Sequence, residues 1–191
     1  MSDTVEFDGD GLARCPWGTA PEIYRDYHDL EWGRPIRGDD ALFERVSLEA
    51  FQSGLSWLVI LRKREAFRKA FDGFRIAKVA AYTDDDAARL LEDAGIVRNR
   101  LKIAATIANA KAAARLDGGL SDLVWSFAPE PRERPKRIAD VPAVTAESTA
   151  LSKALKKHGF KFVGPTTAYA MMQAIGMVDD HLADCHVPVR S

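Results

Sequence analysis

The sequence predicts an all-α fold, and three observations support this prediction: the spacing of the apolar residues, the alanine-rich stretches, and the residues that start and stop helices. Apolar residues recur at helical intervals, whereas the alternating pattern typical of strands is almost absent. With 191 residues, 47% of them hydrophobic, the chain can bury a core without disulfide bonds. We expect a single helical domain over residues 12–191.

Capping residues and glycines set the predicted helix boundaries. Thr83 precedes three aspartates, which place a cap and favourable negative charge at a helix start. The stretch from Pro129 to Pro142 is rich in proline and basic residues, so we expect an ordered surface loop there. The predicted helices run from Pro21 to near Gly33, from Asp39 or Asp40 to about Ser53, from Thr83 to Gly95, from about Leu101 to Leu116, from Thr145 to Gly159 and from Pro165 to near Gly176.

Residues 1–11 differ from the rest of the chain in composition. Asp3, Glu6, Asp8 and Asp10 stand here among glycines, so we expect a disordered N-terminal extension. No apolar run is long enough to span a bilayer, and the N-terminus has no basic segment followed by an apolar one. These features predict a cytoplasmic protein without a membrane partner.

The charges nearly balance, with a formal net charge of -1, which argues against a protein coated in positive charge. Basic residues nevertheless cluster over residues 62–69, 98–102 and 153–161. Each cluster taken alone is most simply an ordinary solvated helix face. A nucleic-acid partner therefore requires a second, independent signal.

Two cysteines and two histidines form a candidate metal site at the two ends of the chain. Twelve residues separate Cys15 from His28, and three separate His181 from Cys185, which places the second pair one turn apart if that segment is helical. The spacing matches no zinc finger, chance pairing explains it nearly as well, and His186 could replace His181. Four protein ligands would make a zinc ion structural and would tie the termini together.

Glu49 is a candidate functional carboxylate because it interrupts an apolar helix stripe. The stripe contains Leu42 and Val46, and an ionised carboxylate buried there without a partner costs several kcal/mol. Glu49 must therefore pair with a cation, accept hydrogen bonds or face a cavity, and a core salt bridge is as good an interpretation as a cavity. The nearby aromatic residues suit a flat pocket for a purine, although many of them could be core: Tyr24, Tyr27, Trp32 and Trp57.

The segment from Asp86 to Ala105 resembles a helix-hairpin-helix motif. Such a hairpin presents backbone N–H groups to a phosphate, and Arg98, Arg100 and Lys102 would add positive charge. Any pair of antiparallel helices in a bundle could share this pattern. Sequence-independent DNA binding is the function that it favours.

Several longer motifs follow one another in collinear order between Leu12 and Cys185. Together they resemble the 3-methyladenine DNA glycosylase I family. The motifs are C-P-W-G at Cys15, Y-H-D-x-E-W-G at Tyr27, L-E-A-F-Q-S-G-L-S-W at Leu48, A-G-I-V-R-N-R-L-K-I at Ala94, L-S-K-A-L-K-K-H-G-F-K-F-V-G at Leu151 and D-H-L-A-D-C at Asp180.

The resemblance implies a helix-hairpin-helix DNA glycosylase fold and base-excision repair of alkylated double-stranded DNA. It places a single structural zinc ion on Cys15, His28, His181 and Cys185. It assigns Glu49, Tyr27 and Trp57, with Tyr24 as a weaker assignment, to the pocket for the flipped base, and it assigns Gly54 and Leu55 to the wedge that enters the base stack. Leu101 stands at a hairpin position where the family pattern has glycine.

The expected reaction is hydrolysis of the bond between 3-methyladenine and deoxyribose. A purine methylated at N3 is cationic and leaves as a neutral base, so a strong general acid is dispensable. Glu49 would accept a hydrogen bond from the exocyclic amine, Trp57 would stack on the cation and water would attack the sugar. Lys102 is expected to contact phosphate rather than form a Schiff base, and we expect a monomer without an obligate protein partner.

Two other functions compete with this one. A zinc-stabilised DNA-binding module without catalysis would keep the hairpin but would have no use for Glu49. A helical glycosylase for another lesion, such as uracil or an oxidised purine, would release a different base.

Overall fold

The computed structural model describes residues 2–189 and is built almost entirely from helices. The α-helices are α1 (Glu22–Leu30), α2 (Asp39–Gln52), α3 (Trp57–Ala70), α4 (Ile76–Ala80), α5 (Asp84–Glu92), α6 (Arg100–Ala113), α7 (Gly119–Trp125), α8 (Ala146–Lys157) and α9 (Pro165–Ala174). Shorter elements are β1 (Glu6–Phe7), β2 (Ala13–Arg14) and the 3-10 turns η1 (Pro16–Gly18), η2 (Asp72–Phe74) and η3 (Ile138–Asp140). The predicted all-α class is confirmed, with one short hairpin of strands added.

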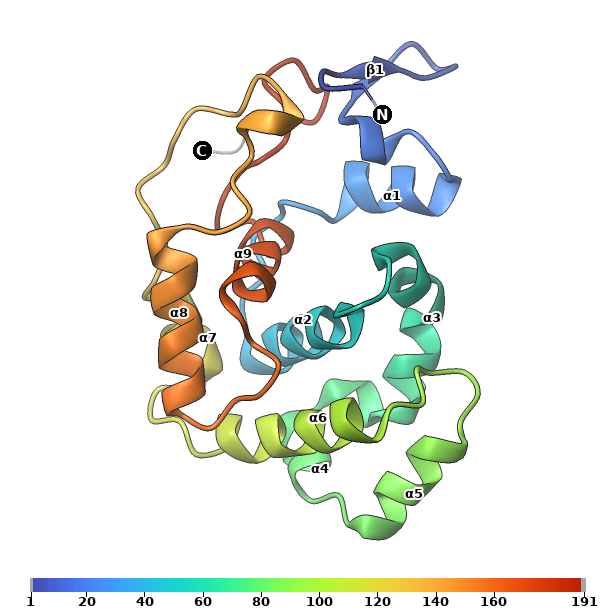
Figure 1. Ribbon diagram of the computed structural model, residues 1–191, viewed down its shortest axis with the longest axis vertical. Helices are drawn as coiled ribbons and strands as arrows, with labels where there is room; N and C mark the ends of the chain where they lie inside the picture. The colour runs from blue at the N-terminus through green and yellow to red at the C-terminus, as the bar shows by residue number, and fades with distance from the viewer. Residues whose placement is uncertain (1, 190–191) are drawn as a thin grey trace.

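Helix α2 lies at the centre of the molecule (Figure 1). It packs against α3, α6, α7 and α9, while α4 packs on α6 and α8 packs on α9. Most side chains of α2 are buried, including Phe43 and Phe51, because this helix is covered on several sides. A functional residue on α2 is therefore held by a rigid core.

Capping residues explain where two of the predicted helices begin. Thr83 forms a capping box with Asp86 at the start of α5, and Thr145 forms one with Ser148 at the start of α8. Each box satisfies backbone N–H groups that the first helical turn leaves free. The predicted starts at Thr83 and Thr145 are confirmed.

Helices α3, α4 and α7 lie outside the helices that the sequence analysis predicts. In α3 the apolar residues from Trp57 to Leu61 are contiguous and a basic stretch follows them, so no helical stripe stands out. Ser56 occupies the cap position, but its side chain makes no capping hydrogen bond. The helix forms because Ile60, Leu61 and Phe67 are buried in the main core.

Residues 2–11 are folded onto the molecule, in contrast to the disorder expected for the N-terminal extension, of which Met1 lies outside the described residues. Strand β1 pairs antiparallel with β2. The carboxylate of Asp10 accepts hydrogen bonds from both Nη atoms of Arg14, and Asp8 accepts one from Arg25. Two of the four acidic residues that suggested disorder, Asp8 and Asp10, thus find basic partners in the fold, and these partners neutralise their mutual repulsion.

The two ends of the chain meet at one pole of the molecule (Figure 1). Cys15, Leu182, Cys185 and Val187 form a small buried cluster, separate from the main core and flanked by Val5, Trp17 and Ile138. Among the described residues, no helix combines the length and the apolar character needed to cross a membrane. The terminal segments thus have their own packing, with the cysteines at its centre.

Candidate active site and metal centre

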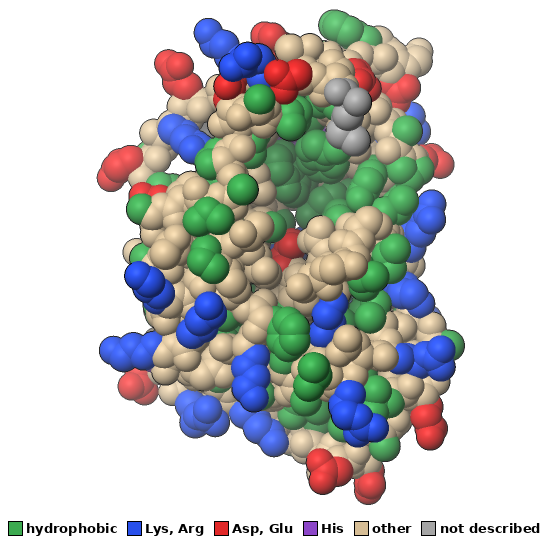
Figure 2. All heavy atoms as spheres, in the orientation of Figure 1, with side chains coloured by type: hydrophobic (Ala, Val, Ile, Leu, Met, Phe, Trp, Pro, Cys, Tyr) green, Lys and Arg blue, Asp and Glu red, His purple; other side chains and the backbone are tan. Residues whose placement is uncertain are grey.

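A cavity of about 350 Å³ opens between α1, α3 and α9. Its walls are largely aromatic: Trp17, Tyr24, Tyr27, Trp32 and Trp57 line it, and we call this cavity the aromatic pocket. Figure 2 shows a hollow lined by hydrophobic side chains, with an acidic side chain visible inside it. The ring centroids of Tyr27 and Trp57 are 5.5 Å apart, so these rings form one continuous wall. Such a pocket fits a flat, ring-shaped ligand.

Glu49 is the carboxylate that α2 contributes to the aromatic pocket. The residue is only 5% exposed, and its side chain receives no hydrogen bond from the residues 2–189 that the structure describes. Burial raises the pKa of Glu49 to about 7, and the positive charge of Arg45 opposes part of that rise. A buried carboxylate without a protein partner is suited to accept a hydrogen bond from a ligand. The sequence left three alternatives for Glu49: an ion pair, accepted hydrogen bonds or a position facing a cavity. In the structure Glu49 faces a cavity.

Further polar side chains of the pocket come from α2, α9 and the C-terminal segment: Gln52, Gln173 and Asp180. Asp180 is held in a buried network, in which it accepts hydrogen bonds from Arg132, Tyr169 and Gln173. Because the Asp180 carboxylate accepts hydrogen bonds from three side chains of the protein, it stabilises this wall of the pocket.

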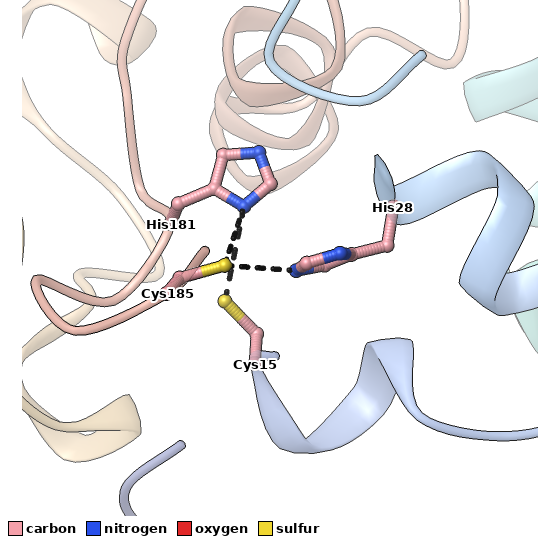
Figure 3. A group of neighbouring side chains, drawn as sticks. All are labelled: Cys15, His28, His181 and Cys185. Atoms are coloured by element: carbon pink, nitrogen blue, oxygen red, sulfur yellow. Dashed lines mark hydrogen bonds between the residues drawn. The ribbon is translucent and has the colours of Figure 1, made fainter. Parts of the chain in front are cut away.

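The four predicted metal ligands converge in one buried cluster, which we call the Cys/His cluster (Figure 3). The Sγ atom of Cys185 lies 3.6 Å from Nε2 of His28 and 3.7 Å from Nδ1 of His181, and Sγ of Cys15 lies 3.9 Å from the same Nδ1. Tetrahedral bonds of about 2.3 Å to sulfur and about 2.0 Å to nitrogen separate the ligand atoms by about 3.5 Å. The cluster can therefore hold a metal ion.

Both histidines of the cluster are oriented through their second ring nitrogen. Nδ1 of His28 lies 2.7 Å from Oδ1 of Asp29, and Nε2 of His181 lies 3.3 Å from the carbonyl oxygen of Trp32. When these nitrogens carry the proton, the lone pair of the other nitrogen in each ring points toward the centre of the Cys/His cluster, as metal ligation requires. His186 contacts Asp29 instead and is not in the cluster, so it does not replace His181.

The segment that carries His181 and Cys185 is not helical, although their spacing suits one helical turn. A tight turn brings the two side chains together, because the N–H of Cys185 donates to the carbonyl of Leu182. The N–H of Leu182 in turn donates to Sγ of Cys15, at 3.3 Å. This donation stabilises negative charge on the Cys15 sulfur.

Helices α5 and α6 cover the segment in which the sequence suggests a helix-hairpin-helix, and residues 93–99 connect these two packed helices. Ile96 anchors the connection in the core, whereas Arg98, Arg100 and Leu101 are exposed. The Asn99 side chain caps α6 by accepting from the N–H of Lys102. The N–H groups of Arg100 and Leu101 have no partner among residues 2–189 and so are free to bind a ligand.

Lys102 is turned into the protein, which does not suit the predicted contact with phosphate. Its side chain is buried, and Nζ donates to the carbonyl oxygens of Phe51, at 2.8 Å, and Ser53. Helical periodicity explains the difference, since a half-turn separates Lys102 from the exposed Arg100. Lys102 thus binds the C-terminal end of α2, where the helix carbonyls lack partners of their own.

Gly54 and Leu55 occupy the turn between α2 and α3, beside the aromatic pocket. Gly54 has a φ of +80°, a conformation that glycine adopts without strain. Leu55 is 39% exposed, so an apolar side chain projects from the surface at this turn.

Sequence reasoning missed several residues of the site. Gln173 lines the pocket although it does not stand out in the sequence, and Trp17 and Asp180 are recognisable only as parts of motifs. Arg45 is buried beside Tyr27, and the only available signal was its position one turn before Glu49.

Comparison with known proteins gives consistent results. A family model described as methyladenine glycosylase matches residues 17–188. The chain is 46% identical to the DNA-3-methyladenine glycosylase of Haemophilus influenzae over 90% of its length and 96% of the relative's. It is 45% identical to DNA-3-methyladenine glycosylase 1 of Escherichia coli, covering 91% of this chain and 96% of the relative.

A solved structure of similar shape is that of 3-methyladenine DNA glycosylase I from Staphylococcus aureus. The TM-score is 0.88 at 38% sequence identity, and the match covers 93% of this chain and 98% of the other. The range matched by the family model, 17–188, contains the residues that line the aromatic pocket and three of the four residues of the Cys/His cluster, with Cys15 just before it. The chain belongs to the methyladenine glycosylase family.

Proposed function

We propose that this protein is a DNA-3-methyladenine glycosylase of base-excision repair, which hydrolyses the N-glycosidic bond of 3-methyladenine flipped out of alkylated duplex DNA. One observation carries the proposal: a buried carboxylate without a protein partner, Glu49, faces a pocket walled by aromatic rings. Relatives at 45% and 46% identity are DNA-3-methyladenine glycosylases. The pocket provides what an extruded, cationic purine requires.

Recognition of the base follows from its charge. Glu49 accepts a hydrogen bond from the exocyclic amine of 3-methyladenine, and the charge on the ring strengthens that bond. Trp57 and Tyr27 present π faces that attract the cation. Normal adenine has the same amine but no positive charge, so both interactions are weaker for it. Selectivity is thus electrostatic, and hydrolysis proceeds by attack of water without a covalent enzyme intermediate.

The α5–α6 hairpin acts as a helix-hairpin-helix that binds the DNA backbone. The free N–H groups of Arg100 and Leu101 face a phosphate, and the side chains of Arg98 and Arg100 add positive charge. Figure 2 shows further Lys and Arg side chains on the face onto which the hollow opens. Gly54 and Leu55 form the wedge that fills the space left by the flipped base.

We further propose that the Cys/His cluster holds one structural zinc ion. Two thiolates and two imidazoles in tetrahedral geometry are a preferred zinc donor set, and four protein ligands leave no position for substrate. Zinc supplies folding energy at this site rather than chemistry. His28 and Cys15 on one side and His181 and Cys185 on the other join the two ends of a single domain, which works as a monomer.

The test is chromatographic identification of the free bases that the purified protein releases from methylated duplex DNA. We expect release of 3-methyladenine. Release of uracil or an oxidised purine, from DNA containing those lesions, would instead assign a glycosylase of another specificity. Binding of duplex DNA by a folded, zinc-loaded protein that releases no base would leave a DNA-binding module.

A further inference from the structure

Arg45 is a buried cation without an ion-pair partner. It lies on α2 one helical turn before Glu49, and the residue is 5% exposed. No carboxylate of residues 2–189 lies within 4.0 Å of its guanidinium. Its side chain makes one hydrogen bond there, from Nη1 to the hydroxyl oxygen of Tyr27 at 3.1 Å. Because a buried unpaired charge is costly, this position calls for a functional explanation.

The guanidinium lies behind the aromatic wall of the pocket. Its central carbon is 5.6 Å from the ring centroid of Tyr27 and 5.5 Å from that of Trp57. Arg45 itself does not line the pocket. Its influence on a bound base is therefore exerted through Glu49 and Tyr27 and not by direct contact.

Arg45 is also the charge that acts most directly on Glu49. The positive charge of Arg45 lowers the pKa of Glu49, against the larger upward effect of burial. The other titratable groups that line the pocket are the neutral phenols of Tyr24 and Tyr27 and the carboxylate of Asp180. The remaining charges near these walls are compensated or distant: Glu31 pairs with Arg64, Asp180 pairs with Arg132, and Lys102 binds backbone carbonyls.

The hydrogen bond to Tyr27 has a fixed direction. A guanidinium can only donate, so the Tyr27 oxygen accepts from Arg45. The phenolic proton must then point away from Arg45, which makes Tyr27 a donor toward any other partner. A purine methylated at N3 still offers ring nitrogens that accept a hydrogen bond.

We propose that Arg45 is a positioning residue of the base pocket, which favours the ionised form of Glu49 and fixes the Tyr27 hydroxyl as a donor. The proposal rests on the proposed function and deepens it. A cationic base binds more tightly to the ionised form of Glu49 than to the neutral form, so Arg45 extends activity to lower pH. A neutral side chain at this position would leave Glu49 largely protonated at pH 7.

The test compares three substitutions. Arg45→Met removes charge and hydrogen bond, Arg45→Gln removes the charge and keeps an N–H donor, and Arg45→Lys keeps the charge. Arg68→Met is the matched control, because it removes a partly exposed arginine of α3 that pairs with Glu44 on α2, the helix that also carries Arg45. The pKa of Glu49 is followed by carbon-13 NMR of its carboxyl group in the free protein, and its signal is assigned with Glu49→Gln.

Arg45→Met and Arg45→Gln should raise the pKa of Glu49 by about one pH unit, while Arg45→Lys and Arg68→Met should leave it near the wild-type value. The acidic limb of the pH profile of base release should move to higher pH by the same amount as the pKa of Glu49. The rate of base release should then fall about fivefold at pH 7 and change little at pH 9. Arg45→Gln decides the outcome if Arg45→Met does not fold.

An unchanged Glu49 pKa in Arg45→Gln would overturn the inference. The NMR titration needs no substrate, so it separates this inference from the proposed function. If the wild-type protein released no base, the proposed function would fail while the titration still reported whether Arg45 controls Glu49.

Discussion

Replacing Glu49 with glutamine should stabilise the protein at alkaline pH while it removes the negative charge that attracts the cationic base. Burial raises the pKa of Glu49 from its ordinary value of 4.5 to about 7. The folded state therefore holds the proton more tightly than the unfolded state. Ionisation of Glu49 therefore lowers the free energy of unfolding. This loss of stability is absent below pH 4.5, grows as the pH rises toward 7 and is complete above 7.

The size of this effect follows from the two pKa values. One pH unit between the folded and unfolded pKa corresponds to about 1.4 kcal/mol, so the full penalty is about 3 kcal/mol. Part of it already acts at pH 5. The free energy of unfolding of Glu49→Gln relative to wild type should therefore increase by about 2 to 3 kcal/mol between pH 5 and pH 8.

Urea unfolding at both pH values measures this difference, since the other titrating groups are common to both proteins. Glu65→Gln is the matched control, because the Glu65 side chain is 72% exposed, and its stability difference should stay nearly constant with pH. A Glu49→Gln difference that is equal at pH 5 and pH 8 would refute the reasoning. It would mean that Glu49 is well solvated or paired in the folded state.

Three further perturbations test other parts of the structure. Cys15→Ser or a zinc chelator should separate the terminal segments, seen as loss of bound zinc in mass spectrometry and a fall in Tm, whereas the zinc content of Arg98→Ala should match wild type. Lys102→Met should lower the free energy of unfolding by about 1 to 3 kcal/mol, because the carbonyls at the end of α2 lose their hydrogen-bond donor. Amide hydrogen exchange in the turn at Gly54 should become faster. Unchanged exchange in that turn would contradict the role of Lys102 in holding the end of α2. Arg98→Ala should weaken duplex binding and reduce the salt dependence of log K by about 0.9 if the side chain neutralises one phosphate, and an unaltered slope would place DNA elsewhere.

Much of the helical framework could be predicted from local signals. Thr83 and Thr145 mark helix starts because their side chains satisfy N–H groups within the same few residues. Helix α3 has no such cap and no stripe, so tertiary burial decides its conformation. The acidic N-terminus resembles a disordered tail because its partners, Arg14 and Arg25, are visible only in three dimensions.

The site was predictable to the extent that single residues broke a local rule. The sequence identified Glu49 as an unusual carboxylate on an apolar stripe, and the structure shows that this carboxylate faces the aromatic pocket. Lys102 looked like its basic neighbours, yet helix phase turns it inward. Arg45 and Asp180 could not be predicted, because their roles arise from contacts between segments that are distant in sequence.

The most direct test of the central claim is the single-turnover release of 3-methyladenine from alkylated duplex DNA by wild type, Glu49→Gln and Glu65→Gln, with duplex affinity measured beside it. We expect Glu49→Gln to bind duplex DNA as wild type does but to lose most base release, whereas Glu65→Gln should behave as wild type. Equal release by Glu49→Gln and wild type would contradict the claim that this buried carboxylate recognises the cationic base.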